Sequence, residues 1–101
     1  RNFLPMDIQM KLRRAVELDP TLATGYYNLG YALFRKGEAQ QATRILEVAT
    51  WIAPGMVNPL KLLASIHTAS GRTERLREVY QRLSELEPAN IEARTWLERS
   101  P

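Results

Sequence analysis

Apolar residues recur along the chain at the spacing of helix faces. Within residues 24–36, one stripe of apolar and small side chains recurs at steps of three, four and seven: Tyr26, Leu29, Gly30 and Leu33. Such spacing places these side chains on one side of a helix. Gly37 follows the segment, where a helix end favours a residue that tolerates positive φ. The pattern therefore predicts a helix over residues 24–36.

The same spacing predicts three further helices after this one. Their predicted core faces are Ala42, Ile45, Leu46, Ala49 and Ile52 on one helix, Leu60, Leu63, Ala64 and His67 on the next, and Leu76, Val79, Tyr80, Leu83 and Leu86 on the third. Pro54, Gly71 and Pro88 are expected to end them in turn. Asn58 is expected to cap the middle helix, with Pro59 in its first turn.

Two more helices are predicted near the ends of the chain, over residues 6–18 and 90–99. No segment alternates apolar and polar residues for long, so strands are not expected. Short links between helices imply antiparallel neighbours. The predicted fold is all-α, an α-α superhelix of about six antiparallel helices.

Prolines and glycines recur with a period of 34 residues. Pro20, Pro54 and Pro88 keep this interval, and so do Gly37 and Gly71. A fixed period of this length indicates a repeat architecture. We therefore expect one domain, residues 1–101, built of a half repeat 1–22, full repeats 23–56 and 57–90, and a terminal helix 91–101. Because the chain begins with arginine, we expect a piece of something longer.

The first full repeat resembles the tetratricopeptide repeat family, whose unit is a helix-turn-helix of 34 residues. The matching signature places hold Leu29, Gly30, Leu33, Ala42, Leu46, Ala49 and Pro54, with Tyr26 where the family usually has tryptophan. The second repeat departs from the pattern, because Leu76 and Leu83 stand where the family prefers alanine. These larger side chains are expected to spread or rotate the second helix pair. The resemblance implies a non-catalytic scaffold that binds a segment of a protein partner in a concave groove lined by the first helices.

Composition excludes several other classes. The 101 residues are 45% hydrophobic and 25% charged, which is usual for a soluble globular domain and not for a disordered chain. Cysteine is absent, so no disulfide or thiolate zinc site is expected, and no apolar stretch approaches the ~20 residues of a membrane helix. The net charge is only +3 and the basic residues are scattered, which disfavours a nucleic-acid partner.

A second stripe on the helix 24–36 gives the candidate binding site. Tyr27, Tyr31 and Phe34 recur at steps of four and seven, beside Asn28 and Arg35. Exposed aromatic stripes are rare on soluble monomers unless they bind something, and tyrosine offers a large contact area with a polar tip. We therefore predict that these five residues contact a protein or peptide segment. Lys61 and Ser65, on the first helix of the next repeat, are predicted to join them.

Other interpretations of the stripe stay open at this point. It could pack on a first helix of a preceding repeat, within a longer structural array, or be covered when exposed end helices associate into a homo-oligomer. RNA binding through arginine and tyrosine is a third alternative. The carboxylate clamp of some family members is not expected, because only Asn28 matches its residues.

No catalytic arrangement is predicted. The sequence has no Gly-rich phosphate loop, no nucleophile elbow and no paired carboxylates in an apolar setting. His67 is the lone histidine and belongs to a core face, so a packed, hydrogen-bonded side chain is expected there. Trp96 is expected to cover the end of the stack or to meet a further helix. We expect no enzyme activity, no metal and no cofactor.

Overall fold

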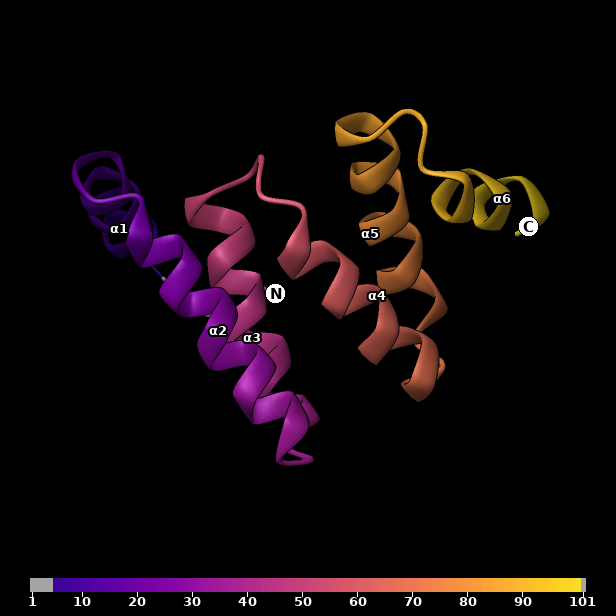
Figure 1. Cartoon of the computed structure of the whole chain (residues 1–101), viewed down its shortest axis with the longest axis horizontal. Helices are drawn as coiled ribbons and strands as arrows, with labels where there is room; N and C mark the ends of the chain where they lie inside the picture. The colour runs from indigo at the N-terminus through magenta and orange to yellow at the C-terminus, as the bar shows by residue number, and fades with distance from the viewer. Residues whose placement is uncertain (1–4, 101) are drawn as a thin grey trace. The chain divides into compact units, whose positions relative to one another are not determined.

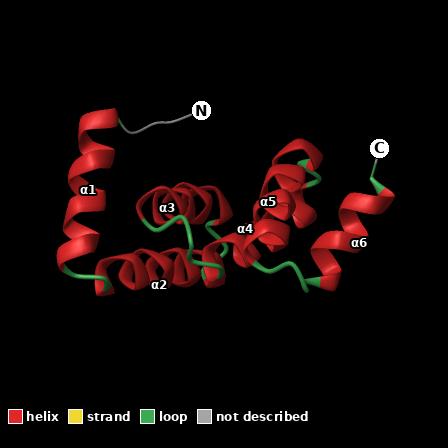
Figure 2. Cartoon of the chain, turned by 90° about the horizontal axis from the view of Figure 1, so that it is seen from above, coloured by secondary structure: helices red, strands yellow, loops and turns green. Residues whose placement is uncertain are grey.

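The computed structural model describes residues 5–100 of the chain. Its helices are α1 (Met6–Leu18), α2 (Thr21–Arg35), α3 (Ala39–Ile52), α4 (Asn58–Ser70), α5 (Thr73–Leu86) and α6 (Ile91–Arg99) (Figure 1). Residues 5–100 contain no strand, as Figure 2 shows. The prediction of an all-α fold of about six helices is therefore confirmed.

The chain divides into two compact units, residues 1–56 and 57–101. In the first unit α2 and α3 form an antiparallel pair, and α1 contacts both (Figure 1). In the second unit α4 and α5 form such a pair, and α6 packs on α5. Packing of consecutive helices within each unit is the arrangement expected of a tetratricopeptide-like array.

The predicted repeat boundaries stay a prediction. Residues 1–4 of the predicted half repeat 1–22, and residue 101 of the predicted terminal helix 91–101, lie outside the described residues.

Glycines end two of the helices as predicted. Gly37 and Gly71 have φ of 86° and 69°, the left-handed region that side chains other than glycine rarely adopt. At the other end of α2 the helix begins at Thr21, three residues earlier than predicted. The Asp19 carboxylate accepts hydrogen bonds from the backbone N (3.2 Å) and Oγ1 (2.6 Å) of Thr21. A helix N-terminus that is satisfied in this way can start before the apolar stripe does.

The prediction that Asn58 caps α4 is wrong. Asn58 is the first helical residue, and Val57 before it already has a helical backbone with φ −85° and ψ −37°. The Lys61 N–H donates to the Val57 carbonyl at 3.1 Å, so the first turn starts one residue earlier than a cap at Asn58 requires. An asparagine cap exists instead at α6, where Asn90 Oδ1 accepts from the Ala93 N–H at 2.9 Å.

The core of the first unit lies where α2 meets α3. Ala42, Leu46 and Ala49 are fully buried on α3, as predicted. Gly30 faces them so closely that a Cβ added to it would lie 2.7 Å from Leu46 Cδ2. A contact this short is far inside ordinary van der Waals separation. The small residue at position 30 is therefore what lets the two helices approach.

The predicted core face of α2 needs one correction. Leu29 is 48% exposed, Tyr26 and Leu33 are half-buried, and the buried residues are Ala23 and Gly30, two turns apart. The helix thus packs on α3 at Gly30, at one edge of the first predicted stripe, and leaves Leu29 exposed on one side and Tyr31 on the other. On one flank Leu29 borders an open apolar hollow of about 340 Å³.

The core of the second unit agrees with the prediction except at one residue. Leu60, Leu63 and Ala64 on α4 are buried, and so are Leu76, Val79, Tyr80 and Leu83 on α5. Leu86 is 39% exposed, contrary to the prediction, because it is the last residue of α5 and α5 ends there. Leu76 and Leu83 are accommodated inside this core; a spreading of the helix pair by these leucines stays a prediction.

Candidate partner-binding surface

Five of the predicted site residues lie together on α2. We call Tyr27, Asn28, Tyr31, Phe34 and Arg35 the α2 surface. Asn28 and Arg35 are exposed, Tyr31 is 42% exposed, and Tyr27 and Phe34 are half-buried. The three rings are therefore not sealed inside the first unit. Half-burial of Tyr27 and Phe34 holds them in place, and Tyr31 is the ring most open to a ligand.

Local contacts orient this surface. The Arg35 Nη1 donates a hydrogen bond to Tyr31 Oη at 3.2 Å, and the Arg35 Cζ lies 5.8 Å from the Tyr31 ring centroid. The rings of Tyr27 and Tyr31 are 6.3 Å apart between centroids, with an angle of 30° between their planes. A guanidinium beside a ring keeps other N–H groups for planar partners such as carboxylates and backbone carbonyls. The α2 surface thus presents aromatic area next to an oriented cation.

The sequence spacing explains why these residues share a face. Tyr27, Tyr31 and Arg35 follow one another at steps of four, which is slightly more than one helical turn. Because α2 packs on α3 at Gly30, this line lies at the edge of the packed side and not within it.

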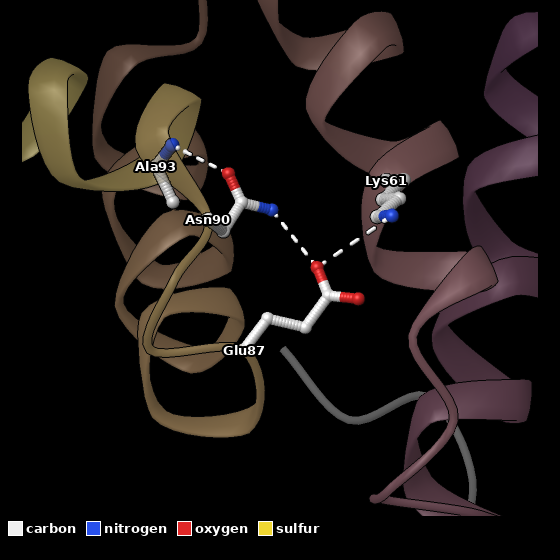
Figure 3. A network of polar contacts seen from close by, with 4 residues as sticks. All are labelled: Lys61, Glu87, Asn90 and Ala93. Atoms are coloured by element: carbon white, nitrogen blue, oxygen red, sulfur yellow. Dashed lines mark hydrogen bonds and ion pairs between the residues drawn. The ribbon is translucent and has the colours of Figure 1, made fainter.

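Lys61 and Ser65 lie one turn apart on α4, in the second unit, and both are exposed. Lys61 is not a solitary cation: its Nζ is 3.5 Å from Glu87 Oε1, which follows the end of α5 (Figure 3). The same oxygen accepts a hydrogen bond from Asn90 Nδ2 at 3.0 Å, and Asn90 in turn caps α6. An acidic ligand group would therefore compete with Glu87 for Lys61. The Ser65 Oγ donates only a long bond, 3.4 Å, to the Lys61 carbonyl.

A cluster that the sequence analysis did not select lies between α5 and α6. The Tyr80 hydroxyl donates to Glu92 Oε1 at 2.9 Å, and the Tyr80 and Trp96 rings are 5.3 Å apart between centroids. The Arg77 Cζ lies 5.5 Å from the Trp96 centroid. Burial, reinforced by the hydrogen bond and negative charge of Glu92, raises the pKa of Tyr80 to about 12. Beside this cluster is an open hollow of about 470 Å³, lined by Tyr80, Glu92, Thr95, Trp96, Arg99 and Ser100.

His67 is packed as predicted but is not fully hydrogen-bonded. It is 2% exposed, and its Nδ1 has no hydrogen-bond partner. Burial, together with the positive charges of Arg75 and Arg72, lowers the pKa of His67. The side chain is therefore held in its neutral form in the interior.

Among residues 5–100, no three His, Cys, Asp or Glu residues converge as a metal site would require. None of the helices there has the length and apolar character needed to cross a bilayer.

A comparison with known families supports this repeat architecture. The family described as TPR repeat, the tetratricopeptide repeat, matches residues 11–37, which include most of α1 and all of α2. This match confirms the resemblance inferred from the sequence, over about a quarter of the chain. A comparison with curated proteins finds no match. Tetratricopeptide repeats generally mediate protein–protein interactions and are typically non-catalytic.

Proposed function

We propose that this protein is a non-catalytic interaction module that binds an extended segment of a protein partner on the α2 surface. The observation that carries the proposal is the exposed Tyr31 ring with Arg35 hydrogen-bonded to it. Aromatic and arginine side chains dominate the energetics of protein interfaces, and here both stand on a rigid helix. A peptide segment supplies what they recognise, an apolar side chain for the ring and carbonyl or carboxylate oxygens for the guanidinium.

The half-buried neighbours favour a preformed site. Tyr27 and Phe34 are already fixed by packing, so a ligand need not order them. Binding to side chains that are held before the ligand arrives loses less conformational entropy than binding to mobile ones. Asn28 is exposed on the same helix, where its amide can pair with a peptide backbone through both its donor and its acceptor. Lys61 and Ser65 stay predicted contributors from the second unit.

Backbone amide chemical shifts, recorded during titration with capped peptides, test the proposal. The panel contains acidic-aromatic, basic-aromatic and polar sequences, and oligouridylate is the nucleic-acid arm. A bound peptide should shift the amides of residues 27–35 most strongly. Tyr31→Ala should raise the Kd about tenfold or more, as expected for a central interface tyrosine. Gln41→Ala, a change at an exposed residue of α3, is the matched control and should leave the Kd unchanged.

Three outcomes would contradict the proposal. Shifts confined to α3 or α5 would place the ligand elsewhere. Binding of oligouridylate that weakens steeply with salt, with no peptide binding, would favour RNA. Concentration-dependent sedimentation that Tyr31→Ala abolishes, again without peptide binding, would show that the α2 surface is covered by a second copy of the chain.

A further inference from the structure

The hollow between α5 and α6 combines aromatic area with charge in the manner of a recognition site. Trp96 is half-buried, and the centroids of its ring and the Tyr80 ring are 5.3 Å apart. This packing fixes the position of the indole, which still borders the hollow. Arg77 is held over the indole, and Arg99 lines the hollow itself. The chemistry matches that of the α2 surface, where Arg35 stands beside Tyr31.

The 34-residue period gives an independent reason to connect the two places. Thr95, Trp96 and Arg99 on α6 follow Lys61, Leu62 and Ser65 on α4 by one period, and Tyr27, Asn28 and Tyr31 on α2 by two. Residues at corresponding repeat positions occupy corresponding faces of their helices. Three of the residues beside the hollow thus stand at the register positions from which the candidate partner-binding residues were chosen.

The balance of charge indicates the class of ligand. Two guanidinium groups, of Arg77 and Arg99, stand around the indole and the hollow, against one carboxylate, of Glu92. One oxygen of that carboxylate already accepts a hydrogen bond from the Tyr80 hydroxyl. Guanidinium groups bind carboxylates with paired hydrogen bonds, and an arginine held on a ring needs little further ordering to do so. An acidic side chain is therefore the complementary partner, and the indole is the contact for an apolar one.

We propose that the α5–α6 hollow binds an acidic peptide segment, with carboxylates on Arg77 and Arg99 and an aromatic or aliphatic side chain on Trp96. This inference rests on the proposed function in one respect, namely that the protein binds an extended partner segment. It adds a second contact point, in the second unit, and assigns the ligand a charge.

Tryptophan fluorescence gives a direct readout. The chain has two tryptophans, and Trp51→Phe leaves Trp96 as the reporter; the Trp51 carbonyl that accepts from Arg13 is retained in this variant. The probe is a short capped peptide of glutamates around one phenylalanine, and its lysine counterpart is the control. The acidic probe should change the Trp96 emission saturably, and the lysine peptide should not. Added salt should weaken the binding.

Two conservative variants separate recognition from a structural role. Arg99→Gln should raise the Kd for the acidic probe about threefold, the size expected for an exposed ion pair. Glu92→Gln should lower the Kd by a similar factor, because it removes the negative charge of Glu92 from the hollow. The glutamine keeps an oxygen that can accept the hydrogen bond from the Tyr80 hydroxyl. A merely structural Glu92 would give no gain in affinity. An unchanged Kd in both variants would overturn the inference, and so would a Trp96 emission that does not change when the acidic probe is added.

The same titrations distinguish this inference from the proposed function. If Tyr31→Ala abolishes peptide binding and the Trp96 emission does not respond to the acidic probe, the α5–α6 site is rejected and the α2 surface is retained. A response of Trp96 to the acidic probe, with no peptide shifting the amides of residues 27–35, would reject the α2 surface and retain the α5–α6 site. Oligouridylate that matches the acidic probe in affinity and emission change would overturn the assignment to a peptide.

Discussion

Gly30→Ala offers a sharp test of how α2 packs on α3. The substituted Cβ would lie 2.7 Å from Leu46 Cδ2 and 2.8 Å from Leu46 Cγ. Leu46 is fully buried, so its side chain has no solvent to move into. Gly25 lies in the same helix, and apart from its chain neighbours and the backbone of the helix itself no heavy atom lies within 4 Å of its Cβ position. Gly25→Ala is therefore a matched control with the same change in chemistry and no clash.

The magnitude follows from two opposing effects. Replacing a helical glycine by alanine stabilises the folded state by about 0.5–1 kcal/mol, through helix propensity and the entropy of the unfolded chain. Gly25→Ala should show this gain alone. Overpacking a tight core costs about 1–3 kcal/mol. Gly30→Ala should therefore lower the free energy of unfolding by about 1 kcal/mol relative to wild type, and by about 1–3 kcal/mol relative to Gly25→Ala.

Urea unfolding followed by circular dichroism at 222 nm measures both variants. A double-mutant cycle with Leu46→Ala isolates the contact, because that change removes the two atoms that clash. The double variant should be more stable, by about 1 kcal/mol or more, than the two single effects added together. If Gly30→Ala and Gly25→Ala unfold at the same urea concentration with equal slopes, close approach at Gly30 does not exist and the derived packing is wrong.

Three further predictions concern the second unit. Because burial lowers the folded-state pKa of His67, the unfolded chain takes up more protons below about pH 6.5, and the free energy of unfolding should fall on acidification by at most ~1.4 kcal/mol per pH unit. Urea titrations between about pH 7.5 and 5.5 should show a weaker dependence of this free energy on pH in His67→Gln. An unaltered dependence would contradict the prediction. Gly71→Ala should lower the free energy of unfolding by about 1 kcal/mol, and with it the melting temperature, because Gly71 has a φ of 69°. Gly55→Ala, at an open position without positive φ, should change the melting temperature little, and equal effects of the two variants would show that the backbone angle is not responsible. Glu87→Gln should tighten binding of the acidic-aromatic peptide about threefold by freeing Lys61, and adding Lys61→Met should remove the gain. An unchanged Kd in the single variant means that Lys61 does not meet the partner segment.

The helices and most of their core faces could be predicted from the sequence. Apolar spacing identifies the buried face of α4 at Leu60, Leu63 and Ala64 because that face is continuous and covered along its length. The positive φ of Gly37 and Gly71 follows from glycine placed just after a helical stripe. These features depend on residues close in the chain, so the local pattern contains enough information to specify them.

The exposed flanks of α2 could not be predicted in the same way. Both the Leu29 stripe and the Tyr31 stripe have helical spacing, and the spacing alone does not determine which side of α2 meets α3. That choice is made by a tertiary fit, the contact of Gly30 with Leu46. For the same reason the prediction that Asn58 caps α4 was wrong, because Val57 before it is already helical and takes the cap position. Helix ends are the least determined part of a helical pattern.

The ion pair of Lys61 and the hollow beside Trp96 show a different limit of sequence reasoning. Each depends on a residue from another helix or turn: Glu87 for Lys61, and Tyr80 for Trp96. The 34-residue period marks position 96 as equivalent to position 28, but it cannot show that Tyr80 packs on the indole or that Arg77 covers it. A repeat specifies which positions share a face, whereas the residues that flank that face decide its charge and shape. Differences among repeats at flanking positions, such as Arg77 and Glu92, are therefore where the ligand preference of this protein is expected to be encoded.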